Sequence, residues 1–322
     1  MLMYEAIRDF AKQFEWEPRV VNEKKRKKFK KFIVAGMGGS HLAADLLKSY
    51  DPYLDITIHK DYGLPAFSGE VLKNSLIIAS SYSGNTEEII DAYERALKTD
   101  LPLGVMASGG KLLDLAKKNK TPHIQLPDIG IEPRVALGFS IKAILKLIDD
   151  EKGLVEAQNL AALLRPMDLE KEGQNLASTL KGKVPIIYSS TTNLGLAYNW
   201  KIAFNETGKI PAFYNVFPEL NHNEMTSFGM APPTKALSSF YHFLILKDSS
   251  DGERILKRME VLERLFRDRK FPVTVVELNG ESKLHKIFNS FVLVNWSALY
   301  TAKEYGVDPE EVPLVEEFKK LI

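Results

Sequence analysis

Short apolar runs alternate with amphipathic segments along most of the chain. In the first half, the runs that we expect to form buried strands are residues 32–35, 55–59, 75–80, 103–107 and 123–126. Between them, segments such as 40–49 and 86–97 carry apolar side chains at the three- and four-residue spacing of a helix. Repetition of strand, loop and helix favours right-handed crossovers and a parallel sheet covered by helices on both faces.

The same pattern begins again in the second half. An apolar helix is expected over residues 135–149, and residues 150–182 are polar, strand-free and broken by Pro166. We expect the domain boundary there, giving domains 1–152 and 153–322. The strands expected after it are residues 185–189, 212–216, 239–246 and 273–278, and the helices are 194–205, 284–305 and 312–321. The sequence therefore predicts two tandem doubly wound, flavodoxin-like α/β domains with parallel sheets.

Composition excludes several classes of protein. The chain has 322 residues, 45% hydrophobic and 26% charged, which is typical of a folded globular protein. Its 43 basic residues balance 42 acidic ones, so net charge does not favour nucleic acid as a partner. There is no cysteine, which excludes disulfides, thiolate metal sites and cysteine nucleophiles. We interpret the basic run 24–31 as a solvated helix end. With no signal peptide and no apolar run near 18 residues, we expect a cytoplasmic protein without a membrane span.

Two loops rich in glycine and serine follow predicted strands. They are residues 36–40 (GMGGS) and residues 80–86 (SSYSGNT), and the second leads directly into a helix. At the carboxyl ends of parallel strands, small residues allow main-chain N–H groups to approach an anion. The hydroxyls of Ser81, Ser83 and Thr86, together with the helix start, favour a phosphate. Neither loop matches a P-loop or a dinucleotide fingerprint, and each alone is equally consistent with an ordinary strand-to-helix turn.

Candidate acid–base residues lie mainly in the second half. His222 stands in PELNHNE, a segment dense in hydrogen-bonding groups, although a solvated surface loop has the same composition. Glu206 ends an apolar helix, where the helix dipole is expected to raise the pKa of an acid and suit it to act as a base. Arg134 begins a helix and either reaches for an anion or pairs with a neighbouring acid. The six histidines show no helical pairing, so no metal is expected.

Several motifs occur in one order along the chain. They are GMGGS (36–40), SYSGNTEE (81–88), EPRVALG (132–138), NETGK (205–209), PELNHNE (218–224) and GVDP (306–309), followed by Phe318 and Lys319. Together they resemble the bifunctional phosphoglucose/phosphomannose isomerase family over nearly the whole chain. SYSGNT alone indicates only a sugar isomerase (SIS) domain, and the NET and PELNHNE motifs narrow the resemblance to this family.

The resemblance implies two SIS domains, a homodimer, and no metal or organic cofactor. It implies interconversion of glucose 6-phosphate and mannose 6-phosphate with fructose 6-phosphate, through ring opening and a cis-enediolate. The residues that it assigns to the phosphate are Gly39, Ser40, Ser81, Ser83 and Thr86. Glu206 would be the base and Arg134 would stabilise the enediolate. His222, from the partner subunit, and Lys319 would open the sugar ring, although Lys320 leaves the register of the lysine open.

Some positions depart from the family, and other functions stay open. His41 and Leu42 follow the first loop where the family often has small residues, which would narrow the entrance. Residues 312–315 contain no hydroxyl group before the terminal lysine, so none is assigned. A non-catalytic SIS module that senses sugar phosphates would need the phosphate loops but neither Glu206 nor His222. An isomerase of another phosphosugar is the third possibility.

Overall fold

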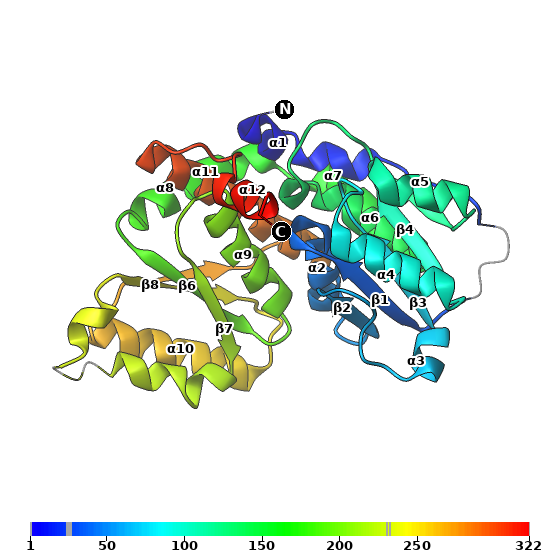
Figure 1. The fold of residues 1–322 in the computed structure, drawn as a ribbon. Helices are drawn as coiled ribbons and strands as arrows, with labels where there is room; N and C mark the ends of the chain where they lie inside the picture. The colour runs from blue at the N-terminus through cyan, green and yellow to red at the C-terminus, as the bar shows by residue number, and fades with distance from the viewer. Residues whose placement is uncertain (1, 24–27, 230, 232, 322) are drawn as a thin grey trace. The chain divides into compact units, whose positions relative to one another are not determined.

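The computed structural model describes residues 2–23, 28–229, 231 and 233–321, which form two compact units (Figure 1). Unit 1 spans Asp9–Leu164, and unit 2 combines Leu2–Arg8 with Arg165–Ile322. Each unit contains its own parallel sheet, so the prediction of two parallel-sheet α/β domains is confirmed. Residues 24–27 of the basic run lie outside the described residues.

Unit 1 is built on a sheet with the order β2-β1-β3-β4-β5, in which each neighbouring pair is parallel. Its strands are β1 (Lys31–Gly36), β2 (Ile56–His59), β3 (Ser75–Ser80), β4 (Leu103–Ala107) and β5 (His123–Gln125). Its helices are η1 (Phe10–Glu15), η2 (Gly38–Ser40), α2 (Leu42–Tyr50), α3 (Gly69–Lys73), α4 (Glu87–Lys98), α5 (Gly110–Lys118), η3 (Pro133–Val135), α6 (Leu137–Leu147) and α7 (Glu151–Leu163).

The core of unit 1 explains the continuous apolar runs of its strands. All six residues of β3 are buried, as expected for a central strand covered on both faces. Ile33, Ile77 and Val105 point to one face and share a core cluster with the apolar sides of α4 and α5. That packing fixes where α4 begins, directly after the second glycine- and serine-rich loop.

Unit 2 has a sheet with the order β7-β6-β8-β9, again parallel throughout. Its strands are β6 (Val184–Ser190), β7 (Phe213–Phe217), β8 (Tyr241–Lys247) and β9 (Val273–Glu277). Its helices are α1 (Met3–Arg8), η4 (Pro166–Leu169), α8 (Glu170–Thr179), α9 (Leu194–Glu206), η5 (Glu219–Asn221), η6 (Glu224–Phe228), η7 (Lys235–Ser238), α10 (Glu253–Asp268), α11 (Lys283–Tyr305) and α12 (Pro313–Lys319).

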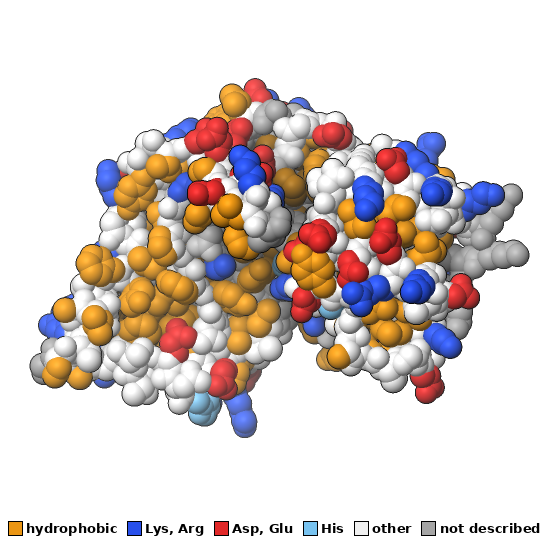
Figure 2. Space-filling model, in the orientation of Figure 1, with side chains coloured by type: hydrophobic (Ala, Val, Ile, Leu, Met, Phe, Trp, Pro, Cys, Tyr) orange, Lys and Arg blue, Asp and Glu red, His pale blue; other side chains and the backbone are white. Residues whose placement is uncertain are grey.

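Aromatic side chains fill much of the core on one side of the unit 2 sheet. Phe243 of β8 packs on Phe266 of α10 with ring centroids 4.4 Å apart, and Phe228 lies 4.9 Å from Phe243. Phe228 belongs to η6, so this cluster anchors the segment that follows β7 to the sheet. Figure 2 shows further hydrophobic side chains on the surface over β6 and β7, where Phe213 and Tyr214 are exposed.

The division between the units differs from the expected boundary at 152/153. It falls between Leu164 and Arg165, so that α7 belongs to unit 1. Lys142 of α6 is buried and donates to the carbonyl of Phe14 at 2.7 Å and to Gln158 of α7. Because the surface of α7 is polar, the sequence pattern did not indicate these contacts.

Among the described residues, no helix has the length and apolarity required to cross a membrane.

Candidate active site

Two loops of unit 1 emerge next to each other at the carboxyl edge of its sheet. The chain runs from β1 outwards to β2 and then returns to place β3 on the other side of β1, and open α/β sheets bind ligands at such a reversal. Gly36, at the end of β1, pairs in register with Ser80, at the end of β3. The loops 36–40 and 80–86 predicted from the sequence therefore start at the same point.

Ser40 connects the two loops through its main chain and its side chain. Its carbonyl accepts a hydrogen bond from Ser80 Oγ at 2.6 Å, and its Oγ accepts one from the Tyr82 N–H at 2.9 Å. Because Ser40 Oγ is the acceptor in the second bond, its own hydroxyl proton can still be donated to a ligand.

The side chain of Tyr82 in the second loop stays protonated. Burial raises its pKa to about 12, with Asp128 and Glu132 adding to the effect, so the hydroxyl group remains a neutral donor to the carbonyl of Pro127.

The second loop presents three hydroxyl groups ahead of α4. Ser81 Oγ accepts from the Gly84 N–H at 3.1 Å and lies 2.8 Å from Thr86 Oγ1, while Ser83 Oγ accepts from the Asn85 N–H at 3.3 Å. Ser81 is fully buried, Thr86 is half-buried and Ser83 is exposed. The arrangement favours Ser83 and Thr86 as the groups that a ligand meets first, with Ser81 orienting Thr86.

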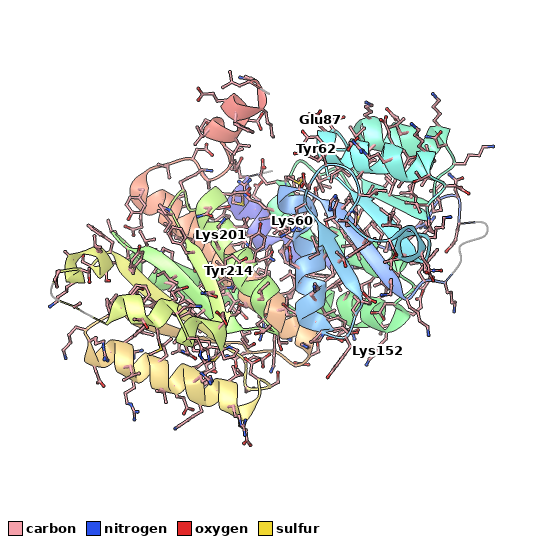
Figure 3. The ribbon with its side chains drawn as sticks, turned by 60° about the horizontal axis from the view of Figure 1, so that its bottom comes forward. Lys60, Tyr62, Glu87, Lys152, Lys201 and Tyr214 are labelled. Carbon is pink, nitrogen blue, oxygen red and sulfur yellow. The ribbon has the colours of Figure 1, made fainter. Side chains whose placement is uncertain are left out.

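The loop after β2 also reaches the beginning of α4. Tyr62 lies beside Glu87 in the first turn of that helix (Figure 3). Tyr62 is exposed, but partial desolvation of its phenol, followed by the nearby carboxylates of Glu87 and Glu88, raises its pKa. The main-chain N–H of Gly63 donates to Asp91 Oδ2 of α4 at 2.7 Å. This loop is a part of the edge that the sequence did not predict.

A third loop, which the sequence also did not predict, packs against the second. Gly84 has a φ of +72°, and a Cβ built there would lie 1.8 Å from the carbonyl oxygen of Gly109. Gly110 has the same φ, and its Cβ would lie 2.4 Å from the carbonyl oxygen of Ser83. Only glycine fits both the left-handed conformation and the close approach of the two backbones. The signal was present as Ser108-Gly109-Gly110 directly after β4.

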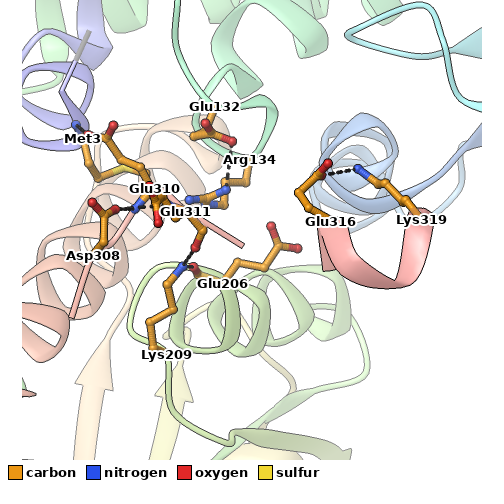
Figure 4. Close-up of polar contacts among 10 residues, drawn as sticks. All are labelled: Met3, Glu132, Arg134, Glu206, Lys209, Asp308, Glu310, Glu311, Glu316 and Lys319. Atoms are coloured by element: carbon orange, nitrogen blue, oxygen red, sulfur yellow. Dashed lines mark hydrogen bonds and ion pairs between the residues drawn. The ribbon is translucent and has the colours of Figure 1, made fainter. Parts of the chain in front are cut away.

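Arg134 lies against the first loop of the same unit. A Cβ on Gly39 would be 2.8 Å from the Arg134 main-chain nitrogen, so the two backbones touch. The arginine side chain is 4% exposed, and its Nη1 donates to Glu132 Oε2 at 3.1 Å (Figure 4). The alternative of pairing with a neighbouring acid is therefore observed, at a position beside Gly39 and Ser40.

His41 is buried directly behind the first loop. Its Nδ1 lies 2.6 Å from Asp45 Oδ2 one turn along α2, and both side chains are more than nine-tenths buried. The pair fixes the start of α2 in place of an ordinary side-chain cap. The side chain of His41, where the family often has a small residue, is therefore buried inside unit 1.

Glu206 is the last residue of α9 in unit 2 and is half-buried. The N–H groups of Thr207 and Gly208 both donate to the carbonyl of Ala203, at 2.9 and 3.0 Å, which closes the helix. Lys209 then adopts a φ of +56° and donates its ammonium group to the carbonyls of Glu206 and Glu311 (Figure 4). A lysine therefore occupies the negative end of this helix, next to the candidate base.

His222 lies in a segment that is held by the sheet on one side and by α10 on the other. Tyr188 Oη of β6 donates to Glu224 Oε1 at 2.6 Å, and Asn215 of β7 donates to Glu224 Oε2. On the other side of His222, Arg258 Nη1 donates to Asn221 Oδ1 at 3.2 Å. His222 itself is exposed, so its neighbours are fixed and its imidazole is presented outwards.

Lys319 is at the end of α12, a helix whose side chains are all exposed. Its Nζ lies 2.7 Å from Glu316 Oε1, an exposed pair of small energetic value. The side chains of Leu314, Val315 and Phe318 on the same helix are also exposed. The choice between Lys319 and Lys320 as the family's terminal lysine stays open.

The corresponding edge of unit 2 carries a polar cluster absent from the sequence prediction. Asp248 follows β8 and receives Lys286 Nζ at 2.7 Å, and both groups are largely buried. Burial raises the pKa of Asp251, partly offset by a hydrogen bond with Ser190 at the end of β6. Asp248 and Lys286 satisfy each other, whereas the buried Oδ2 of Asp251 has no hydrogen-bond partner in the described part of the chain. Among the described residues, no three His, Asp or Glu side chains are grouped to hold a metal, and the absence of a cofactor stays a prediction.

A comparison with solved structures identifies the class of fold. Glucosamine-6-phosphate deaminase from Thermotoga maritima matches with a TM-score of 0.63 over 97% of this chain and 97% of that chain, at 14% identity. A family model described as the bacterial phospho-glucose isomerase C-terminal SIS domain matches residues 169–322. The fold is that of the SIS phosphosugar-isomerase class.

Curated relatives then identify the family. A bifunctional phosphoglucose/phosphomannose isomerase from Caldicellulosiruptor bescii is 32% identical over 98% of this chain and 96% of the relative. One from Aquifex aeolicus is 29% identical over 99% of this chain and 97% of the relative. This chain belongs to the bifunctional phosphoglucose/phosphomannose isomerase family, as the order of its motifs indicated.

Proposed function

We propose that this protein interconverts glucose 6-phosphate and mannose 6-phosphate with fructose 6-phosphate by ring opening and proton transfer through a cis-enediolate. The observation that carries the proposal is the convergence of the Ser40 and Ser81–Thr86 loops at the strand reversal of unit 1, in a chain that matches a member of the family over 98% of its length. Neutral hydroxyl and N–H donors suit a sugar phosphate better than a nucleotide with its metal ion.

The phosphate group is the part of the substrate that does not react, so its binding energy can orient the reacting carbons. In the proposal, Ser40, Ser83 and Thr86 donate to the phosphate oxygens, and Ser81 orients Thr86. The hydrogen bonds of Ser40 and Ser83 leave their hydroxyl protons available, which supports this assignment. The partial positive charge at the start of α4, which has 12 residues, adds to the attraction.

Isomerisation moves one proton between C2 and C1. Glu206 removes the C2 proton of the open-chain aldose and returns it to C1, while a proton moves from the C2 hydroxyl to the carbonyl oxygen at C1. The enediolate formed between these steps carries negative charge. Arg134 stabilises that charge, since a guanidinium group stays positive without gaining or losing a proton. One base serves both epimers if the open chain can rotate about its C2–C3 bond.

Ring opening needs proton transfer to the ring oxygen and from the anomeric hydroxyl. His222 and Lys319 carry these transfers in the proposal, with His222 supplied by the partner subunit of a homodimer. The outward presentation of His222 supports a role on a neighbouring copy. A cytoplasmic location follows from the substrate, because a doubly charged hexose phosphate does not cross a bilayer unaided.

The test is a coupled assay of the purified protein with each hexose phosphate, with and without a chelator. Both epimers should be turned over, and the chelator should have no effect. Glu206→Gln should lower kcat by about a hundredfold or more, because a general base contributes on that scale. This variant should still bind inorganic phosphate, as measured by competition with fructose 6-phosphate. Unchanged turnover would remove Glu206 as the base.

A different substrate is the second candidate function. Glucosamine 6-phosphate shares the phosphate and the open-chain carbonyl chemistry, and it should be compared in the same assay. Activity with the amino sugar alone would exclude the dual hexose activity. Binding of hexose phosphates without any turnover would instead favour a sensing module.

A further inference from the structure

Lys209 occupies a position that links two parts of unit 2 which both bear proposed catalytic residues. Its ammonium group donates to the main-chain carbonyl of Glu206, at the end of α9, and to that of Glu311 (Figure 4). Glu311 stands in the connection between α11 and α12, eight residues before Lys319. One side chain therefore holds together the end of the helix that carries Glu206 and the start of the segment that carries Lys319.

The connection is itself an organised turn. Asp308 Oδ1 accepts the N–H groups of Glu310 and Glu311, at 2.7 and 3.1 Å, and Glu310 Oε1 accepts the N–H of Met3 at 2.6 Å. The two main-chain hydrogen bonds, with Lys209 nearby, lower the pKa of Asp308. Asp308 thus aims the carbonyl of Glu311 at Lys209, and α1 holds the turn from its other side.

Lys209 also offsets an unfavourable electrostatic interaction at Glu206. The last carbonyls of a helix lack main-chain donors, and their partial negative charge is unfavourable to a carboxylate at the same place. An ammonium group bound to the Glu206 carbonyl satisfies one of these acceptors and offsets that charge. The left-handed conformation of Lys209, with φ of +56°, directs the chain back so that its side chain reaches the helix end.

We propose that Lys209 is a positioning residue for Glu206, which fixes the end of α9 and the turn at 308–311 so that the base keeps its reactive geometry and its charge. This proposal rests on the proposed function, because it assumes that Glu206 transfers the proton. Lys209 acts through Glu206 and has no contact with substrate in this scheme.

The experiment compares Lys209→Met with Lys209→Arg in the full-length protein. Lys209→Met should lower kcat at least about tenfold and leave KM within about threefold, because a small displacement of a catalytic group affects the chemical step most. Lys209→Arg should retain most of the activity, since arginine keeps the charge and can reach the same carbonyls. Lys257→Met is the matched control, because Lys257 is an exposed lysine of α10 paired only loosely with Glu260 at 3.6 Å.

Two readouts separate positioning from simple loss of structure. The acidic limb of the kcat–pH profile should move to higher pH in Lys209→Met and stay in place in Lys209→Arg, because only the former loses the charge. Ethylammonium added to Lys209→Ala should restore part of kcat and part of the deuterium incorporation from D2O at C2. A structural defect remote from the base would not respond to a soluble amine.

The outcomes distinguish this proposal from the proposed function. If the wild type turns over neither epimer, or if Glu206→Gln is fully active, the proposed function is wrong. If the wild type is active, Glu206→Gln is inactive, and Lys209→Met matches Lys257→Met in kcat, the positioning role of Lys209 is wrong. Should Lys209→Met fail to fold, Asp308→Ala decides the matter: a lower kcat at unchanged KM supports the role, and wild-type kinetics contradict it.

Discussion

His242 is a buried titratable residue outside the proposed catalytic groups. It lies in β8, is 3% exposed, and has its Nε2 2.8 Å from Thr274 Oγ1 of β9. Burial, followed by the positive charges of Lys183 and Arg267, lowers its pKa from 6.5 to about 4. The folded protein therefore keeps this imidazole neutral over a range in which the unfolded chain protonates it.

This residue predicts a loss of stability in mild acid. Between pH 6.5 and about 4 the unfolded state binds more protons at His242 than the folded state does, so stability falls as the pH decreases. The full contribution is about 3 kcal/mol, present above pH 6.5 and absent below pH 4. Urea unfolding at pH 7 and pH 5 should show that His242→Gln has a weaker pH dependence than the wild type. An equal change in the free energy of unfolding between pH 7 and pH 5 in the two proteins would contradict the assignment.

Gly84 gives a second prediction at this scale. A Cβ there would lie 1.8 Å from the Gly109 carbonyl oxygen, so Gly84→Ala must separate the second and third loops. We expect at least a tenfold weaker affinity for inorganic phosphate, measured by competition with fructose 6-phosphate, because displaced donors lose their alignment. Gly182→Ala is the control: Gly182 has a φ of +71°, but nothing lies within 4 Å of its added Cβ. If both variants bind phosphate equally, the close approach of the loops does not matter for binding.

The segment 218–224 is the element whose rigidity bears most directly on the proposed ring opening. Its main anchor is Glu224, which receives hydrogen bonds from Tyr188 and Asn215 in two strands. Tyr188 is fully buried, and burial followed by the charge of Glu224 strongly raises the pKa of its hydroxyl, so it stays a donor. The anchor therefore holds over the whole physiological pH range.

Removal of this anchor should affect both stability and catalysis. Tyr188→Phe should cost about 1.5–3 kcal/mol in urea unfolding, the usual value of a hydrogen bond to a charged group. It should also lower kcat, because the segment bearing His222 loses one of its two links to the sheet. Tyr93→Phe is the matched control, since its buried hydroxyl lies 2.8 Å from Thr121 Oγ1 in unit 1. A loss of stability without any loss of kcat in Tyr188→Phe would show that this anchor does not position His222.

The elements that the sequence predicted best are those with a local signal. The strands 75–80 and 103–107 match β3 and β4 residue for residue, because continuous burial gives an uninterrupted apolar run. The helix α10 was not predicted, although Met259, Leu262 and Phe266 repeat at the spacing of one buried face. Its polar majority obscured that stripe. The division between the two compact units differs from the expected boundary for the same reason, since few residues of α7 are buried.

At the scale of the whole molecule, the proposed homodimer predicts that each active site needs residues from two chains. Glu206→Gln and His222→Ala should each be nearly inactive alone. A hybrid dimer of the two variants should contain one site with both wild-type residues, provided that His222 serves the neighbouring copy. Random reassortment of equal amounts should therefore restore about a quarter of the wild-type activity, because half of the dimers are hybrids with one working site. Purified hybrids without activity would exclude shared sites.

The sequence by itself determined the two parallel sheets, the loops after β1 and β3, and the family, because these depend on local periodicity and on motifs contiguous in the chain. Only the tertiary structure decided which backbones touch. It placed Gly39 on Arg134, Gly84 on Gly109, and Lys209 on the carbonyls of Glu206 and Glu311. These pairs are distant in sequence or depend on main-chain geometry, which side-chain patterns do not encode. They form because packing of the helices against each sheet fixes the ends of the elements, and the loops must then meet within a few ångströms.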